Sequence, residues 1–101
     1  MSSHKFNLIV SPLAQQDIDD IFQYTLETWG ERQLEKYGDI LKAAMSGLTE
    51  NPRIGTEKRG TPFRSFHVGS HTIFYKIGEK AIHIIRVLHE SMDFPRHVPS
   101  D

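Results

Sequence analysis

Two amphipathic helical patterns follow each other in this chain with one glycine between them, and this feature constrains the fold most. Apolar residues recurring every three or four positions predict a helix over residues 12–29. Ser11-Pro12 is typical of a helix start, and Gly30 is typical of a helix end. The same periodicity predicts a second helix over residues 31–50, which Asn51-Pro52 ends. Helices joined by so short a connection must form a helical hairpin.

Short β-branched and aromatic segments on either side of this hairpin predict four strands. One lies at residues 6–10, and three follow at residues 64–68, 71–77 and 81–88. Gly69-Ser70 is typical of a two-residue turn between two of them. The order predicts an α+β domain (β-α-α-β-β-β) in which the helical hairpin packs on one face of a small antiparallel sheet.

Alternation along the predicted strands at residues 64–68 and 71–77 indicates which of their side chains share a face of the sheet. Helical spacing indicates which side chains of the first helix are buried. Residues 52–63 form a polar loop, long enough to suggest a function. The predicted core side of the strand pair comprises Phe66, Val68, His71, Ile73 and Tyr75, and its half-exposed side comprises Ser65, His67, Thr72, Phe74 and Lys76. The predicted buried stripe of the first helix comprises Ala14, Ile18, Ile21, Phe22, Thr25 and Trp29.

Length and composition exclude several classes of protein. The chain has 101 residues, so we expect one domain over residues 1–101, with flexible ends at 1–5 and 98–101. The absence of Cys excludes disulfides, thiolate metal sites and a Cys nucleophile. A formal net charge of −1 gives no strong global attraction to nucleic acid or membrane. Without a membrane-length apolar run or a signal-peptide pattern, the sequence predicts a cytoplasmic protein.

Charge is unevenly divided between the two halves of the chain. Residues 1–51 carry four Lys/Arg and eight Asp/Glu, a balance of −4, whereas residues 52–101 carry eight and five, a balance of +3. Five of the six His also fall in the second half. Two interpretations stay open: ordinary surface charge, or a basic face that meets an anionic partner.

Catalytic and metal-binding patterns are weak. His67 and His71 lie on opposite faces of the predicted strand pair and cannot share an ion, and His89-Glu90 with Asp93 lacks a second ligand cluster. The sequence has no nucleophile elbow, phosphate-binding loop or dinucleotide fingerprint. We therefore expect no metal and no cofactor.

Metal-independent RNA cleavage needs a base, an acid and cations around the scissile phosphate. Residues of the right types are Arg64, Arg86, His71, His89 and the pair Lys58-Arg59. The alternative is structural: Arg64 covers the sheet edge, Arg86 pairs with an acidic neighbour and His71 is a hydrogen-bonded core residue. Composition alone favours the structural alternative for each residue.

Several apolar residues of the predicted helices fall outside the main buried stripes. Leu13 and Tyr24 lie near each other on one flank of the first helix, and Leu26 and Ile40 widen the stripes of the two helices. Two interpretations stay open: scattered exposed apolar residues, or a groove for an amphipathic segment of a partner.

The sequence resembles the ParE family of toxins from bacterial toxin–antitoxin pairs, within the wider RelE/ParE group. The resemblance covers about residues 6–97, and the order and spacing of its fragments carry it. The fragments are Leu8-Ile-Val-Ser-Pro-Leu-Ala14, Asp17-Ile18, Asp20-Ile21, Tyr24, Trp29-Gly30, Tyr37, Leu48, Asn51-Pro52-Arg-Ile-Gly55, Gly69-Ser-His-Thr-Ile-Phe-Tyr75, Ile84-Ile-Arg-Val-Leu-His89, Met92-Asp93 and Arg96-His97. The fold of this group agrees with the pattern predicted above.

This resemblance implies a toxin that inhibits DNA gyrase and is neutralised in a hetero-oligomer by a ParD-like antitoxin. It implies no catalytic residue, no membrane association and no sequence-specific binding of nucleic acid. From the charge and polarity after the last apolar strand, we expect Arg86, His89, Asp93 and Arg96 to contact the target. These strands are expected to turn cationic and His side chains outward. For the antitoxin we expect an acidic or amphipathic segment that folds on binding against Leu13, Tyr24, Leu26 and Ile40.

Two alternatives remain. In a RelE-like mRNA-cleaving ribonuclease, Arg64 and Arg86 would hold phosphate, and His89 would act as acid or base because no Tyr follows Tyr75. An inert relative would survive only as an antitoxin-binding module.

Overall fold

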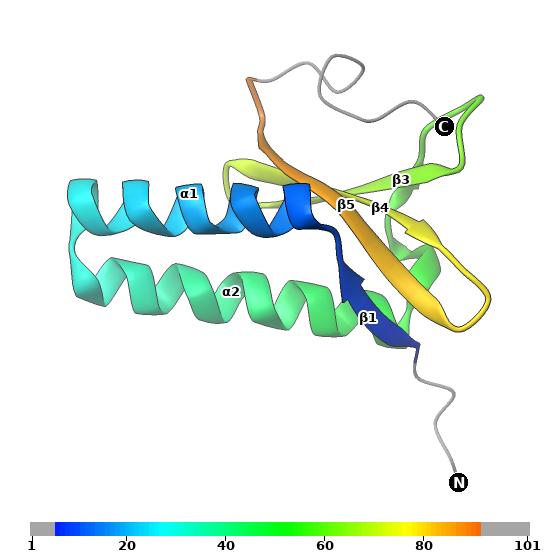
Figure 1. Ribbon diagram of the computed structural model, residues 1–101, viewed down its shortest axis with the longest axis horizontal. Coiled ribbons are helices and arrows are strands. Elements are labelled where there is room, and N and C mark those ends of the chain that lie inside the picture. Colours follow the sequence, from blue (N-terminus) through cyan, green and yellow to red (C-terminus); the bar gives the residue numbers. More distant parts are fainter. Residues whose placement is uncertain (1–5, 92–101) are drawn as a thin grey trace, which may run out of the picture.

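The computed structural model describes residues 6–91 as two helices packed on a five-stranded sheet (Figure 1). The sheet order is β1-β5-β4-β3-β2. The elements are β1 (Asn7–Val10), α1 (Pro12–Trp29), α2 (Glu31–Glu50), the 3-10 helix η1 (Pro52–Ile54), β2 (Thr56–Glu57), β3 (Phe63–Val68), β4 (His71–Ile77) and β5 (Ala81–His89). The α+β class is confirmed, while the expected flexible ends lie outside the described residues.

The helical hairpin has the bounds that the sequence predicts, because its caps are local. The Ser11 hydroxyl accepts a hydrogen bond from the Ala14 N–H at 3.0 Å. Gly30 has φ +93°, a conformation that side chains disfavour, and its N–H donates to the Leu26 carbonyl at 3.0 Å. One glycine thus ends α1 and allows α2 to begin at the next residue.

The sheet is mixed, which corrects the prediction of a wholly antiparallel one. Strand β1 pairs with β5 in parallel, from Asn7 with Ala81 to Val10 with Ile84. The other pairs are antiparallel. A tight turn fixes the direction of a strand pair, but β1 meets β5 only after the rest of the domain has intervened. The predicted polar loop also contains η1 and the short strand β2, which pairs with β3 through Thr56 and Glu57.

The core lies between the helices and one face of the sheet. Ile73, Tyr75 and Val68 are buried there, as alternation predicts, against Ile18 and Ile21 of α1. Helix α2 contributes Leu41, Met45 and Leu48. Burying such side chains stabilises the fold by about 1.5–3 kcal/mol each.

The opposite face of β3 and β4 is more buried than the sequence predicts. Thr72 and Phe74 were expected to be half exposed, yet Phe74 is only 6% exposed. The Lys58 ammonium lies 6.0 Å from the centroid of the Phe74 ring. The chain before β3 therefore covers part of this face, which strand alternation alone cannot show.

The exposure of Trp29 is a third correction. The sequence places it on the buried stripe of α1, but it is 68% exposed. The far end of the helical hairpin extends beyond the sheet in Figure 1, so the last turn of α1 has no strand of the described residues to pack against. Among the described residues, no helix is both long and apolar enough to cross a membrane.

Candidate partner-binding site

The start of α1 forms hydrogen bonds with the backbone of β5 where β1 no longer pairs with it. Strand β1 pairs with β5 only as far as Ile84. Beyond that point, the Ser11 N–H donates to the Ile84 carbonyl at 3.0 Å and the Ser11 hydroxyl donates to the Ile85 carbonyl at 2.9 Å. The Val87 N–H then donates to Asp17 Oδ2 at 2.9 Å. Ser11, the N-cap of α1, and Asp17 within the helix thus take the place of a neighbouring strand.

Asp17 also forms an ion pair with Arg86. The guanidinium donates from Nε to Oδ2 and from Nη2 to Oδ1, both at 2.8 Å, and the two side chains are only 16% (Arg86) and 11% (Asp17) exposed. The hydrogen bonds that Arg86 donates to Asp17 raise the pKa of Arg86. The prediction that Arg86 pairs with an acidic neighbour is confirmed. The expectation of an outward cation is wrong at this position, because the carboxylate neutralises it.

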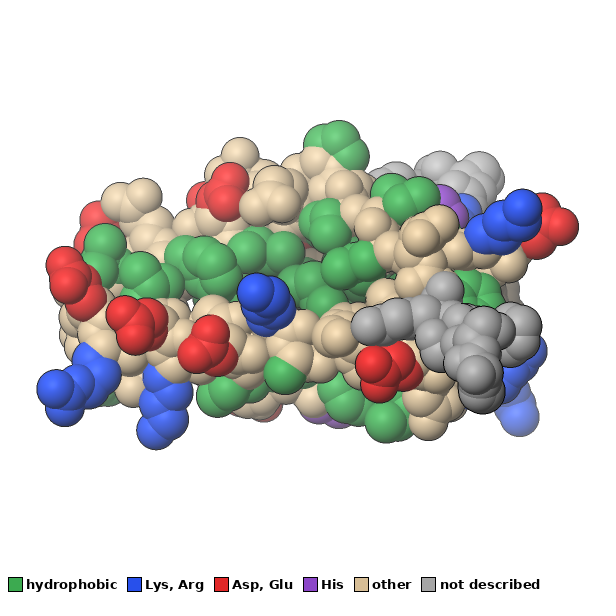
Figure 2. All heavy atoms as spheres, turned by 90° about the horizontal axis from the view of Figure 1, so that it is seen from below, with side chains coloured by type: hydrophobic (Ala, Val, Ile, Leu, Met, Phe, Trp, Pro, Cys, Tyr) green, Lys and Arg blue, Asp and Glu red, His purple; other side chains and the backbone are tan. Residues whose placement is uncertain are grey.

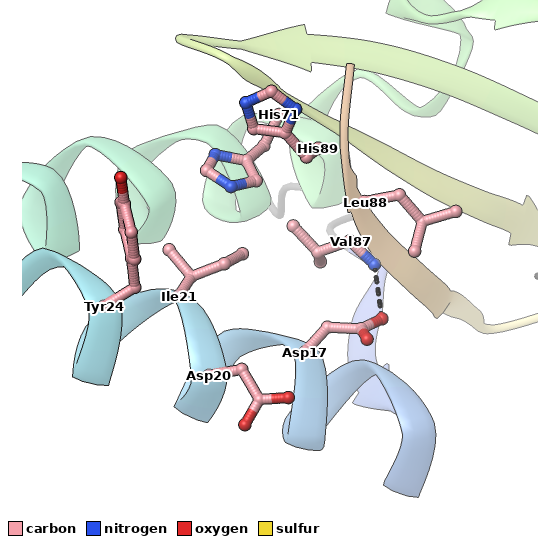
Figure 3. A pocket seen from close by; sticks show the side chains of 8 residues that line it. All are labelled: Asp17, Asp20, Ile21, Tyr24, His71, Val87, Leu88 and His89. Atoms are coloured by element: carbon pink, nitrogen blue, oxygen red, sulfur yellow. Dashed lines mark hydrogen bonds between the residues drawn. The ribbon is translucent and has the colours of Figure 1, made fainter. Parts of the chain in front are cut away.

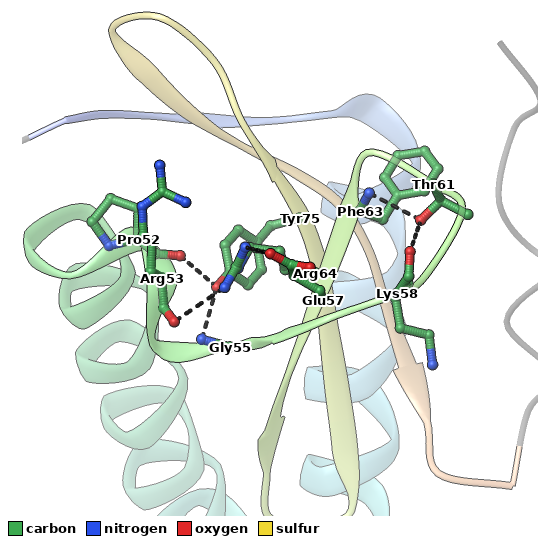
Figure 4. Close-up of polar contacts among 9 residues, drawn as sticks. All are labelled: Pro52, Arg53, Gly55, Glu57, Lys58, Thr61, Phe63, Arg64 and Tyr75. Atoms are coloured by element: carbon green, nitrogen blue, oxygen red, sulfur yellow. Dashed lines mark hydrogen bonds and ion pairs between the residues drawn. The ribbon is translucent and has the colours of Figure 1, made fainter.

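Arg64 is held at the other edge of the sheet (Figure 4). Its side chain is 14% exposed and contacts Glu57 Oε2 and the Arg53 carbonyl, each at 3.3 Å. Its Nε is buried without a hydrogen-bond partner. Arg64 therefore covers the edge near β2, as the structural alternative predicts, and it is not an exposed cation. Strand β4 lies between it and the strand of Arg86.

Tyr75 anchors the loop that Arg64 touches. Its hydroxyl donates to the Pro52 carbonyl at 2.7 Å and accepts from the Gly55 N–H at 3.0 Å. A Cβ at Gly55 would lie 2.5 Å from that hydroxyl oxygen, so only glycine fits there. The sequence places Tyr75 in the core but does not reveal this contact.

A hollow of about 360 Å³ lies between α1 and the ends of β4 and β5 (Figure 3). Its walls are mainly apolar, and its residues with polar groups are two acidic residues, two histidines and one tyrosine. The lining residues are Asp17, Asp20, Ile21, Tyr24, His71, Val87, Leu88 and His89. The structure thus brings three of the predicted residues, Tyr24, His71 and His89, to one site. The separation of His89 from Tyr24 in the sequence gave no indication of this.

His71 is tied to α2. The Tyr37 hydroxyl donates to the Val68 carbonyl at 2.9 Å and lies 2.7 Å from His71 Nδ1. The single proton of the Tyr37 hydroxyl is used in the bond to Val68, so His71 Nδ1 must carry a proton and donate it to Tyr37. Nε2 is then the ring nitrogen that takes up a proton when His71 becomes charged. Burial and the neighbouring His89 lower the pKa of His71, against an opposing effect of Glu90. Burial raises the pKa of Tyr37.

His89 stands next to His71, with ring centroids 5.5 Å apart. His89 Nδ1 accepts a hydrogen bond from the Ser91 N–H at 3.2 Å. His67, in contrast, contacts the Thr72 hydroxyl at 2.9 Å on the opposite face from His71, as predicted. Within residues 6–91, no group of three or more potential metal ligands comes together. Arg86, on the same strand as His89, already pairs with Asp17.

A larger groove of about 640 Å³ lies on the other flank of α1, between the two helices and β1. Figure 2 shows hydrophobic side chains gathered in a hollowed band on this side of the molecule. Ile18 and Phe22 of α1 and Leu41 and Met45 of α2 line it together with Gly38. A Cβ at Gly38 would lie 3.8 Å from Phe22 Cζ, so this glycine leaves the groove open.

The four residues expected to bind the antitoxin are all exposed, but only one of them lines either hollow. Leu13, Leu26 and Ile40 are 47%, 42% and 43% exposed and line neither hollow, whereas Tyr24, 64% exposed, lines the smaller one. The groove is instead lined by residues of the buried stripes, which helical spacing alone assigns to the core. Asp93 and Arg96, expected to contact the target, lie outside the described residues.

Comparison with known proteins decides the family. The family model described as "ParE toxin of type II toxin-antitoxin system, parDE" matches residues 8–94. The chain belongs to the ParE toxin family. It is 38% identical over 93 residues to Toxin ParE1 of Mycobacterium tuberculosis, covering 89% of this chain and 95% of that protein. It is 36% identical over 91 residues to Toxin ParE1 of Caulobacter vibrioides, covering 88% and 94%.

Solved structures of this group share the fold. A structure described as the chromosomal ParDE toxin–antitoxin system from P. aeruginosa matches with a TM-score of 0.75 at 19% identity, covering 86% of this chain and 98% of that one. The toxin–antitoxin complex RelBE2 from Mycobacterium tuberculosis matches with a TM-score of 0.59 at 19% identity, covering 84% and 91%. Two helices on a mixed sheet are therefore the architecture that this chain shares with both.

Proposed function

We propose that this ParE-family protein is the toxin of a type II toxin–antitoxin pair, that it inhibits DNA gyrase, and that a ParD-like antitoxin neutralises it by binding the groove between α1 and α2. The observation that carries the proposal is the family match over nearly the whole chain. The open apolar groove of about 640 Å³ supports the binding of a partner segment. Both structural relatives are described as toxin–antitoxin systems or complexes.

The geometry favours binding over catalysis. An RNA-cleaving site needs cations that are free to meet a phosphate. Arg86 is paired with Asp17 and Arg64 is largely buried against Glu57, on strands separated by β4. Among the described residues that line the hollow with His71 and His89, none is Lys or Arg, so inhibition through contact with gyrase is the better account.

The groove offers an apolar surface to an amphipathic segment. An exposed apolar channel between helices binds the apolar face of a partner helix, and the ordering of that helix is compensated by the area it buries. Ile18 and Phe22 from α1 face Leu41 and Met45 from α2 across the channel. Because Ile18, Leu41 and Met45 are largely buried, they form the floor of the channel, and the antitoxin segment proposed here places its apolar side chains over them.

A supercoiling assay with purified gyrase tests the function, run beside incubation of the protein with mRNA and ribosomes. We expect loss of supercoiling in the first assay, intact RNA in the second, and restored supercoiling when the antitoxin is added. RNA cleavage with unaffected supercoiling would support the ribonuclease instead. If the protein is inert in both assays but binds the antitoxin, it is a binding module only.

A further inference from the structure

Helix α1 carries an acidic and aromatic stripe along the flank that faces the end of β5. Leu13, Asp17, Asp20, Tyr24 and Glu27 follow each other at spacings of three and four, which places them on one side of the helix. Neither Lys nor Arg occurs anywhere in α1. A segment crossing this flank therefore meets negative charge.

Two carboxylates of this stripe, Asp20 and Glu27, can still pair with a cation of a partner. Asp17 is neutralised by Arg86, but Asp20 accepts only a neutral amide, from Gln16 at 2.9 Å. Glu27 likewise accepts from Gln23 at 2.8 Å. Both side chains are exposed, so a cation can approach either of them.

The hollow beside the stripe provides the apolar part of the site. Figure 3 shows Tyr24 and Ile21 on α1 facing the two imidazole rings across it. Its volume of about 360 Å³ is large enough for one aliphatic or aromatic side chain. The Tyr24 ring, 64% exposed, offers its face to a cation at the rim.

We propose that this hollow receives an apolar side chain of the antitoxin, and that a neighbouring Arg or Lys of the antitoxin pairs with Asp20 and stacks on Tyr24. The inference rests on the proposed function, since it takes the antitoxin as the partner. Charge complementarity selects this occupant, because an acidic segment would be repelled by Asp20 and Glu27. The groove lies on the opposite flank of α1, so one antitoxin chain that crosses the helix fills both sites.

The test measures binding of the antitoxin by the full-length chain and two variants at two salt concentrations. Asp20→Lys reverses the charge at the hollow and is expected to weaken binding about tenfold and to flatten its salt dependence. Asp19→Lys is the matched control. It makes the same charge change on the same helix, where Asp19 accepts from Gln15 at 3.1 Å, and it lies outside the stripe.

Equal responses of the two variants, with the wild type binding normally, would overturn this inference and leave the proposed function intact. Failure of the wild type to bind the antitoxin at all would overturn the proposed function as well. Self-association of the wild type that Asp20→Lys abolishes would assign the hollow to a second copy of the chain and overturn the antitoxin assignment. Both substituted positions are exposed, and a thermal melt of each variant confirms that it folds.

Discussion

Replacing Asp17 by Ala removes the contact that joins the start of α1 to the end of β5. The carboxylate accepts three hydrogen bonds, two from Arg86 and one from the Val87 N–H. Loss of one partner of a mostly buried ion pair costs about 3–5 kcal/mol, because the other charge stays desolvated. We take the lower end of this range, since Arg86 keeps 16% of its side-chain surface exposed. Denaturant unfolding is expected to show a loss of about 3 kcal/mol, and the melting temperature to fall by roughly 12–24 °C.

A double-mutant cycle separates the pair from its surroundings. Arg86→Met leaves Asp17 with its hydrogen bond from Val87, and the double variant removes both charges. The double variant is expected to be more stable than the sum of the single losses predicts, with a coupling free energy of about 1.5 kcal/mol or more. Asp19→Ala, an exposed acidic residue of the same helix, is the control and should change stability by less than about 0.5 kcal/mol. A loss below about 1 kcal/mol for Asp17→Ala, or additive losses, would refute this reasoning.

Three further predictions follow from single contacts. Tyr75→Phe leaves the Gly55 N–H and the Pro52 carbonyl without their partner, so the free energy of unfolding should fall by about 1–3 kcal/mol. Hydrogen exchange at the Gly55 amide should become faster, and unchanged exchange would count against the anchoring role of Tyr75. The lowered pKa of His71 means that the unfolded chain binds more protons in mild acid, so stability should be complete above the ordinary pKa of 6.5 and fall as the pH drops below it. His71→Asn should flatten that slope, and an equally steep slope in the variant would assign the effect to other groups. Gly38→Leu fills the groove beside Phe22 and should abolish antitoxin binding without loss of stability, whereas the same substitution at Gly47, where an added Cβ meets no atom within 4 Å, should not affect binding.

The parts of the fold that depend on neighbouring residues could be predicted from the sequence. Ser11, Pro12 and Gly30 set the helical hairpin through local capping, and Gly69-Ser70 sets the register of β3 and β4. The parallel direction of β1 could not be predicted, because no turn connects it to β5. Trp29 fits a buried helical stripe by spacing, but burial requires a strand opposite, and the helix extends past the sheet.

The candidate sites depend on contacts between residues far apart in the sequence, so the sequence predicts only some of their features. Exposure of Tyr24, Leu26 and Ile40 follows from their place on the helical wheel and is observed. The groove could not be recognised, because residues such as Ile18 and Leu41 look like ordinary core positions. Pairing of Arg86 with an acidic residue was one of two alternatives, and only the fold identifies Asp17, 69 positions away, as the partner.

The most direct test of the account is DNA supercoiling by gyrase in the presence of the antitoxin and either the wild-type chain or Gly38→Leu. We predict that both forms inhibit gyrase, and that the antitoxin relieves inhibition by the wild type but not by the variant whose groove is filled. Supercoiling that proceeds unimpeded with the wild-type chain alone would contradict the account, as would full relief of the variant by the antitoxin.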